Sequence, residues 1–131
     1  DTQFSFNSAG YWGGAIYALE NGGAIAAVED DELALVFHGG TFIENSARNG
    51  GALYFEFAIG FDITNATFQS NSASGGSGGA VAASSTGRED SPTATFTRCN
   101  FSDNMSETGG AVETLARQLE FDSCLFEGNS A

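Results

Sequence analysis

The chain has 131 residues, enough for one domain with a continuous core, and 12 of them are phenylalanine. It carries 17 Asp or Glu residues against 4 Lys or Arg residues, a net charge of −13 that repels phosphate backbones and anionic lipid surfaces. This balance excludes nucleic-acid binding, and no apolar run is long enough to cross a bilayer as a helix.

Two short motifs alternate from one end of the chain to the other. The first is Phe-x-x-Asn, and the second is Gly-Gly-Ala followed by Ile, Leu or Val. The copies of the first motif run from Phe4 to Asn7, Phe42 to Asn45, Phe68 to Asn71, Phe101 to Asn104 and Phe126 to Asn129, and those of the second start at Gly13, Gly50, Gly78 and Gly109. A recurring unit of this size predicts a solenoid, in which each coil buries its apolar face against its neighbours.

The first repeat is the longest and contains an acidic run, Glu29, Asp30, Asp31 and Glu32. Carboxylates of this kind are possible calcium ligands. The run lacks the spacing and the glycine of a dedicated calcium site, so we expect a solvated loop and predict no cofactor.

Further along the chain, the residues before each later Phe-x-x-Asn motif alternate between apolar and mostly polar side chains. Leu35-Val36-Phe37 and Phe61-Asp62-Ile63 are two examples. A period of two predicts a strand with its large side chains turned inward. Together with a strand that starts at Gly-Gly-Ala and a short strand that contains the Phe, this predicts three strands per coil.

Insertions fall on one side of the predicted coil. The segment from Phe to Gly-Gly varies little in length, whereas the segment from Gly-Gly to the next Phe varies widely. One insertion in this variable segment contains Arg88, Glu89 and Asp90. Since insertions in a solenoid project from one face, often a binding face, we expect these three residues to be loop contacts.

Stacked coils place equivalent residues about 4.8 Å apart, the spacing of paired strands. The five phenylalanines should therefore form a core stack, and the five asparagines a hydrogen-bonded ladder at a corner, where asparagine tolerates left-handed backbone. Cys99 and Cys124 occupy the same slot in consecutive coils. We expect two buried thiols that act as small apolar fillers, because parallel side chains suit a disulfide poorly, although a surface protein leaves a disulfide open.

The sequence contains few groups for catalysis. The acidic residues at outward strand positions, Glu56, Asp62, Glu113, Glu120 and Asp122, are interpreted as falling in different columns, without the convergent pair that glycoside hydrolysis needs. His38 is the sole histidine and is interpreted as structural. We therefore predict no catalytic residues, no metal site and no enzyme. Asn65 and Asn100 begin glycosylation triplets, which are relevant only in a eukaryotic source.

The alternation of Phe-x-x-Asn with Gly-Gly-Ala-[Ile/Leu/Val] resembles the repeat of the chlamydial polymorphic membrane proteins and of related surface β-helix proteins. The resemblance implies an all-β fold, a right-handed parallel β-helix of the pectate-lyase-like kind, with about four to five coils over residues 1–131. It also implies an exported, adhesin-like protein of the cell surface.

Three function classes follow from these observations. The first is a non-enzymatic, extracellular adhesin-like scaffold whose loops bind a protein or glycan on a cell or matrix surface. The alternative is a structural segment of an extracellular filament or sheath built from copies of itself, and a carbohydrate-active enzyme ranks third. We further expect the 131 residues to be a single repeat segment of a longer solenoid.

Overall fold

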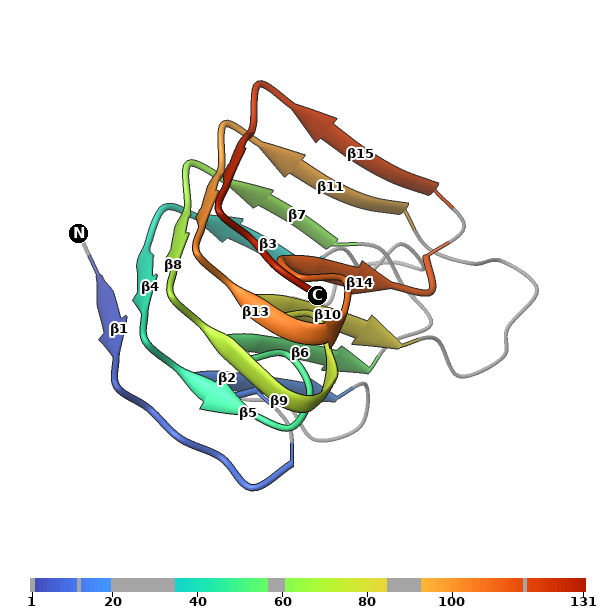
Figure 1. The fold of residues 1–131 in the computed structure, drawn as a ribbon. Helices are drawn as coiled ribbons and strands as arrows, with labels where there is room; N and C mark the ends of the chain where they lie inside the picture. The colour runs from blue at the N-terminus through green and yellow to red at the C-terminus, as the bar shows by residue number, and fades with distance from the viewer. Residues whose placement is uncertain (1, 12, 20–34, 57–60, 85–92, 117) are drawn as a thin grey trace.

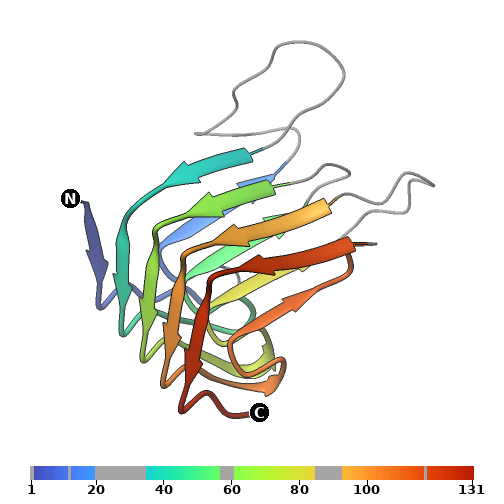
Figure 2. The same ribbon diagram turned by 90° about the horizontal axis from the view of Figure 1, so that it is seen from above.

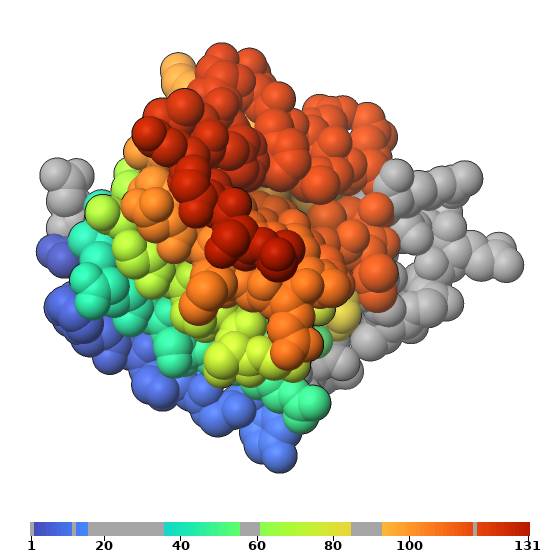
Figure 3. All heavy atoms as spheres, viewed as in Figure 1, coloured from blue at the N-terminus to red at the C-terminus, as the bar shows by residue number. Residues whose placement is uncertain are grey.

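The computed structural model describes residues 2–11, 13–19, 35–56, 61–84, 93–116 and 118–131. Every element in these ranges is a β-strand, and the strands lie in four sheets of parallel strands that stack coil upon coil (Figures 1 and 2). The coloured bands of the surface follow the same order, from blue through green to red (Figure 3). The predicted all-β parallel β-helix is confirmed.

The coils run through the four sheets in a fixed order, which we number 1 to 4; the first coil meets sheet 2 only through an isolated bridge between Ser8 and Ser46. Sheet 1 contains β1 (Gln3–Ser5), β4 (Thr41–Ile43), β8 (Thr67–Gln69), β12 (Asn100–Ser102) and β16 (Leu125–Glu127). Sheet 2 contains β5 (Ser46–Ala47), β9 (Ser72–Ser77) and β13 (Met105–Thr108). Sheet 3 contains β2 (Ile16–Leu19), β6 (Leu53–Glu56), β10 (Val81–Ser84) and β14 (Val112–Thr114). Sheet 4 contains β3 (Leu35–His38), β7 (Phe61–Thr64), β11 (Thr93–Thr97) and β15 (Gln118–Asp122).

Sheet 2 corrects the prediction of three strands per coil. Its strands contain serine in every case, and glycine in β9, but hardly any branched or aromatic residues, so composition does not reveal them as strands. They form because the preceding asparagine fixes their register: the backbone N–H of Ser72 donates to the carbonyl of Asn45 at 2.9 Å, and that of Met105 donates to Asn71 at 2.9 Å. Stacking on neighbouring coils thus outweighs local preference.

The five phenylalanines of the repeat form one column inside the coils. Successive rings, starting from Phe4 and Phe42, are stacked with centroids 5.1, 4.9, 4.9 and 4.8 Å apart and planes within 9° of parallel. Aromatic side chains of sheet 4 meet this column edge-on, as Phe96 does against Phe101 at 5.4 Å. Both arrangements are favourable for aromatic quadrupoles, so the core gains specificity beyond the area it buries.

The corners place residues with ordinary side chains in the left-handed region of φ. Glu44, Ser70 and Asp103 each precede a ladder asparagine and have φ between 52° and 55°. The expectation that the asparagines themselves take up the left-handed turn is therefore wrong. The asparagine side chain must point inward to reach the next coil, so the residue before it makes the bend.

Candidate functional site

The asparagines at the corner between sheets 1 and 2 form a continuous ladder. The side-chain Nδ2 of each one donates to the Oδ1 of the asparagine in the next coil, at 2.9 Å from Asn7 to Asn45, 3.0 Å to Asn71, 2.9 Å to Asn104 and 2.9 Å to Asn129. The backbone N–H of each donates to the same oxygen, as from Asn45 to Asn71 at 3.0 Å. Each Nδ2 after the first also donates to the carbonyl of a Phe in the preceding coil, as Asn71 does to Phe42 at 3.0 Å.

The three central asparagines, Asn45, Asn71 and Asn104, are 0% exposed. Their side-chain amides are hydrogen-bonded to neighbouring coils and shielded from solvent, so these amides cannot contact a ligand. The structure thus gives the ladder a role in holding the coils in register, and the same applies to the buried phenylalanine column.

The glycine pair at the corner between sheets 2 and 3 serves two different needs. The first glycine of each pair has a positive φ, for example 63° at Gly78. The second has no room for a side chain, because a Cβ on Gly79 would lie 2.0 Å from the carbonyl oxygen of Gly110 in the next coil. Both glycines are therefore part of the scaffold.

Cys99 and Cys124 lie one above the other, and both are free thiols. Cys99 is buried as expected, but Cys124 is only half-buried, so the expectation of two buried thiols holds for Cys99 alone. The backbone N–H of Cys99 lies 3.4 Å from the sulfur of Cys124, and each thiol donates to a carbonyl of the preceding coil, Ile63 for Cys99 and Phe96 for Cys124, at 3.3 Å. Burial raises the pKa of the Cys99 thiol from 9.0 to about 11, because an apolar environment disfavours the thiolate. Cys99 is thus an unreactive small filler, in the slot that Ala66 occupies one coil earlier.

This raised pKa predicts a loss of stability in alkali. The unfolded chain releases the Cys99 proton near pH 9 and the folded chain only near pH 11. The contribution of the protonated thiol to the free energy of unfolding is therefore complete below pH 9 and is lost as the pH rises through 11. Relative to the Cys99→Ala variant, the protein should lose about 2 kcal/mol of unfolding free energy between pH 8 and pH 11. Urea unfolding at both pH values measures this difference, and a parallel loss in the variant would refute the assignment.

His38 lies at the end of β3, and its Nδ1 contacts the hydroxyl of Thr64 at 2.5 Å. Among the described residues, no group of three or more His, Cys, Asp or Glu side chains is arranged to hold a metal ion. Within the same ranges, no helix is long and apolar enough to span a membrane.

The strand register corrects one interpretation of the acidic residues. Asp62 and Glu120 lie in the same outward column of sheet 4, with Thr95 between them, and not in different columns. Glu113 of sheet 3 lies apart from them, beside Ala82. The sequence did contain the signal, since all four residues of this sheet 4 column stand six positions before a repeat Phe: Val36, Asp62, Thr95 and Glu120.

The predicted loop residues fall outside the described ranges. Arg88, Glu89 and Asp90 belong to the segment 85–92, and the possible calcium ligands, Glu29, Asp30, Asp31 and Glu32, belong to the segment 20–34. Both segments connect a strand of sheet 3 to a strand of sheet 4, so the variable connections all leave the coils between these two sheets.

Of the two residues that begin glycosylation triplets, Asn65 is exposed in the corner before β8, with φ of 55°, and Asn100 is half-buried in β12.

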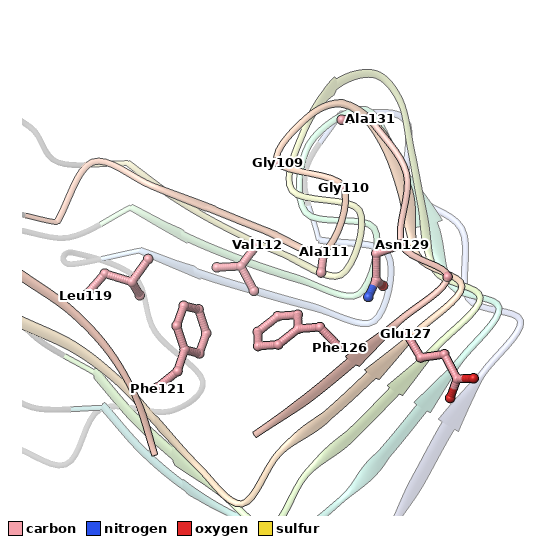
Figure 4. A pocket seen from close by; sticks show the side chains of 11 residues that line it. Gly109, Gly110, Ala111, Val112, Leu119, Phe121, Phe126, Glu127, Asn129 and Ala131 are labelled. Atoms are coloured by element: carbon pink, nitrogen blue, oxygen red, sulfur yellow. The ribbon is translucent and has the colours of Figure 1, made fainter. Parts of the chain in front are cut away.

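The end of the last coil contains a cavity of about 450 Å³ lined by residues of β14, β15 and β16 (Figure 4). Val112, Leu119, Phe121 and Phe126 point into it, and Glu127 points away.

Comparison with known proteins gives one match. The model of the Chlamydia polymorphic membrane protein repeat matches residues 1–19 and 39–56, which hold the first two pairs of Phe-x-x-Asn and Gly-Gly-Ala motifs. No curated protein and no solved structure matches the chain. The resemblance that the motifs predict is therefore confirmed over these two stretches, where the chain is similar to the chlamydial repeat.

Proposed function

We propose that this chain is a non-enzymatic, extracellular β-helical scaffold of the adhesin type, which displays loops for attachment to a cell or matrix surface. The observation that carries this proposal is the match to a repeat of membrane proteins over two stretches of the chain. The described signature residues support a scaffold role, because the ladder asparagines and the stacked phenylalanines contact one another and the backbone of adjacent coils. Binding must then depend on residues outside the signature.

The connections between sheets 3 and 4 are the best candidates for contacts with the target. They differ in length from coil to coil, while the strands on either side keep an unbroken parallel register. The segment 85–92 contains Arg88, Glu89 and Asp90, which offer both signs of charge within three residues. The sequence and length of such connections can vary while the stacked strands keep their pairing, and adaptation to a binding target requires this freedom.

The positions of Asp62 and Glu120 in sheet 4 also support the proposal of a non-enzymatic role. Asp62 and Glu120 are separated by a whole coil that carries Thr95 between them, on a regular strand surface. The described cavity is lined mainly by glycine, alanine and apolar side chains. These surroundings favour packing over general acid–base chemistry.

A cell-attachment assay with the purified chain tests the proposal. We expect saturable binding to epithelial cells or to immobilised matrix glycoproteins, and at least a fivefold loss of binding in the Arg88→Gln/Glu89→Gln/Asp90→Asn variant. The matched control is Arg48→Gln/Glu44→Gln/Glu107→Gln, which removes the same charges from exposed residues elsewhere. Equal binding by both variants would contradict the loop assignment, and cleavage of a polysaccharide panel would contradict the non-enzymatic role.

A further inference from the structure

The acceptor pattern for N-linked glycans, Asn-x-Ser/Thr, begins not only at Asn65 and Asn100 but also at the ladder residue Asn104. The pattern alone does not distinguish the three residues. Their positions in the coils do, because an N-linked glycan is bulky and hydrophilic and must project into solvent. A folded chain therefore accepts a glycan only where the asparagine side chain is exposed.

The coil stack excludes a glycan at Asn104 and disfavours one at Asn100. Asn104 is 0% exposed, and its Nδ2 donates to the carbonyl of Phe68 at 3.0 Å and to Oδ1 of Asn129 at 2.9 Å, which uses both of its hydrogens. Asn100 lies in β12, which pairs with β8 on one side and β16 on the other, and its Oδ1 is buried. A sugar on the same carboxamide has to displace the side chains around it.

Asn65 is the exposed residue of the three. It forms the corner between sheets 4 and 1, where β7 ends and β8 begins (Figure 1). Its backbone N–H donates to the carbonyl of Thr97 at 2.9 Å, which holds the corner in place. The structure gives its side-chain amide no hydrogen bond to another described residue. A substituent on its Nδ2 therefore breaks no contact of this kind, in contrast to one on Asn104.

The same corner has room around it in the adjacent coils. Gly39 holds the position one coil earlier, and a Cβ added there would meet nothing within 4 Å. Arg98 holds it one coil later and is exposed, so a long side chain is accommodated at this corner. Gly39, Asn65 and Arg98 have φ of 74°, 55° and 52°, so each coil makes the same left-handed bend. The stack thus leaves space for a bulky group at Asn65.

We propose that Asn65 is a glycosylation site and carries an N-linked glycan in the exported protein, an inference that rests on the extracellular location proposed above. The reaction is glycosyl transfer from a lipid-linked sugar diphosphate. Nδ2 of Asn65 bonds to the anomeric carbon of the first sugar, the bond from that carbon to the diphosphate oxygen breaks, and Nδ2 releases one proton. Thr67, the first residue of β8, supplies the hydroxyl that the acceptor pattern requires.

A glycan at Asn65 lies apart from the connections between sheets 3 and 4. Those connections lead into the strands of sheet 4, as the segment 85–92 does into β11, whereas the corner at Asn65 follows the end of β7. The glycan therefore covers the corner between sheets 4 and 1, where it adds hydrophilic surface, and leaves the proposed binding loops open.

The occupancy of each triplet in secreted protein tests this proposal. The chain is expressed behind a secretion signal in cultured eukaryotic cells, purified from the medium and treated with an amidase that releases N-linked glycans and converts the glycosylated asparagine to aspartate. Peptide mass spectrometry then measures the modified fraction at each site. We expect Asn65 to be modified in most molecules, Asn100 at least tenfold less and Asn104 not at all. Because the assay supplies its own secretion signal, its result does not depend on whether the loops bind a target.

Substitutions of the threonine provide the controls. Thr67→Ala should abolish the modification of Asn65, whereas Thr67→Ser keeps the hydroxyl and should retain it. The matched control is Thr41→Ala, since Thr41 is the partner of Thr67 in the preceding coil, and this variant should leave Asn65 glycosylated. An unmodified Asn65 in the secreted protein, equal occupancy at Asn100 or Asn104, or a glycan that persists on Asn65 in the Thr67→Ala variant would each overturn the proposal.

Discussion

Replacing Gly79 with alanine should destabilise the protein by more than about 4 kcal/mol, a loss that few single substitutions cause. The added Cβ would lie 2.0 Å from the carbonyl oxygen of Gly110 and 2.6 Å from the backbone nitrogen of Met105. Both atoms belong to backbone held by the next coil, so neither can move without breaking inter-coil hydrogen bonds. Because each coil of a solenoid is stable only through its neighbours, the break should loosen the coils on both sides. Urea unfolding followed by circular dichroism measures the loss.

Gly10→Ala is the matched control for this substitution. A Cβ at Gly10 would meet nothing within 4 Å, and its φ does not lie in the left-handed region. We expect a change within about 1 kcal/mol, in the stabilising direction, because alanine restricts the unfolded chain more than glycine does. Comparable losses at both positions would show that close approach of the coils is not what requires glycine at Gly79.

Replacing Asn71 with leucine should cost about 3–5 kcal/mol, since it leaves several buried polar groups without partners. The substitution removes the Oδ1 that accepts from the backbone and side chain of Asn45, at 3.0 Å each, and the donor to the carbonyl of Phe42. Leucine has a similar volume, so the loss reports the hydrogen bonds more than a cavity. The unfolding free energy from urea titration measures the loss, and hydrogen exchange should show faster opening of β5 and β9.

Asn7→Leu provides the comparison at the exposed end of the same ladder. Asn7 donates to Asn45 through its backbone and side chain, and it is exposed, so water can replace these partners. We expect a loss of about 1 kcal/mol or less. If both substitutions cost the same, burial of the ladder would not be the source of its stability.

The sequence was sufficient to predict the fold because every coil repeats the same inward residues. Aligning the copies on their Phe brings Phe42, Phe68 and Phe101 into one column, and the structure pairs these residues directly. The alignment predicts the pairing because the coils stack in parallel: residues that are one repeat apart in the sequence lie next to each other in paired strands.

Features that arise between coils were harder to predict. The strands of sheet 2 contain too few apolar or branched residues to stand out, and they depend on hydrogen bonds to the neighbouring asparagines. The left-handed residue at each corner varies among Glu44, Ser70 and Asp103, so no residue type marks it.

The asparagine ladder has a consequence for how the length of such a protein can change. Every carboxamide in it is oriented the same way, with Nδ2 toward the next coil, so each coil presents the same donor–acceptor pattern to whatever follows it. Gene duplication of one whole coil would therefore lengthen the rod without requiring any new interaction, and loss of one coil would shorten it as easily. Insertion of a single residue between Phe68 and Asn71 would break the ladder on both sides. Rods of this type can thus vary in steps of one coil while their surface loops diversify independently.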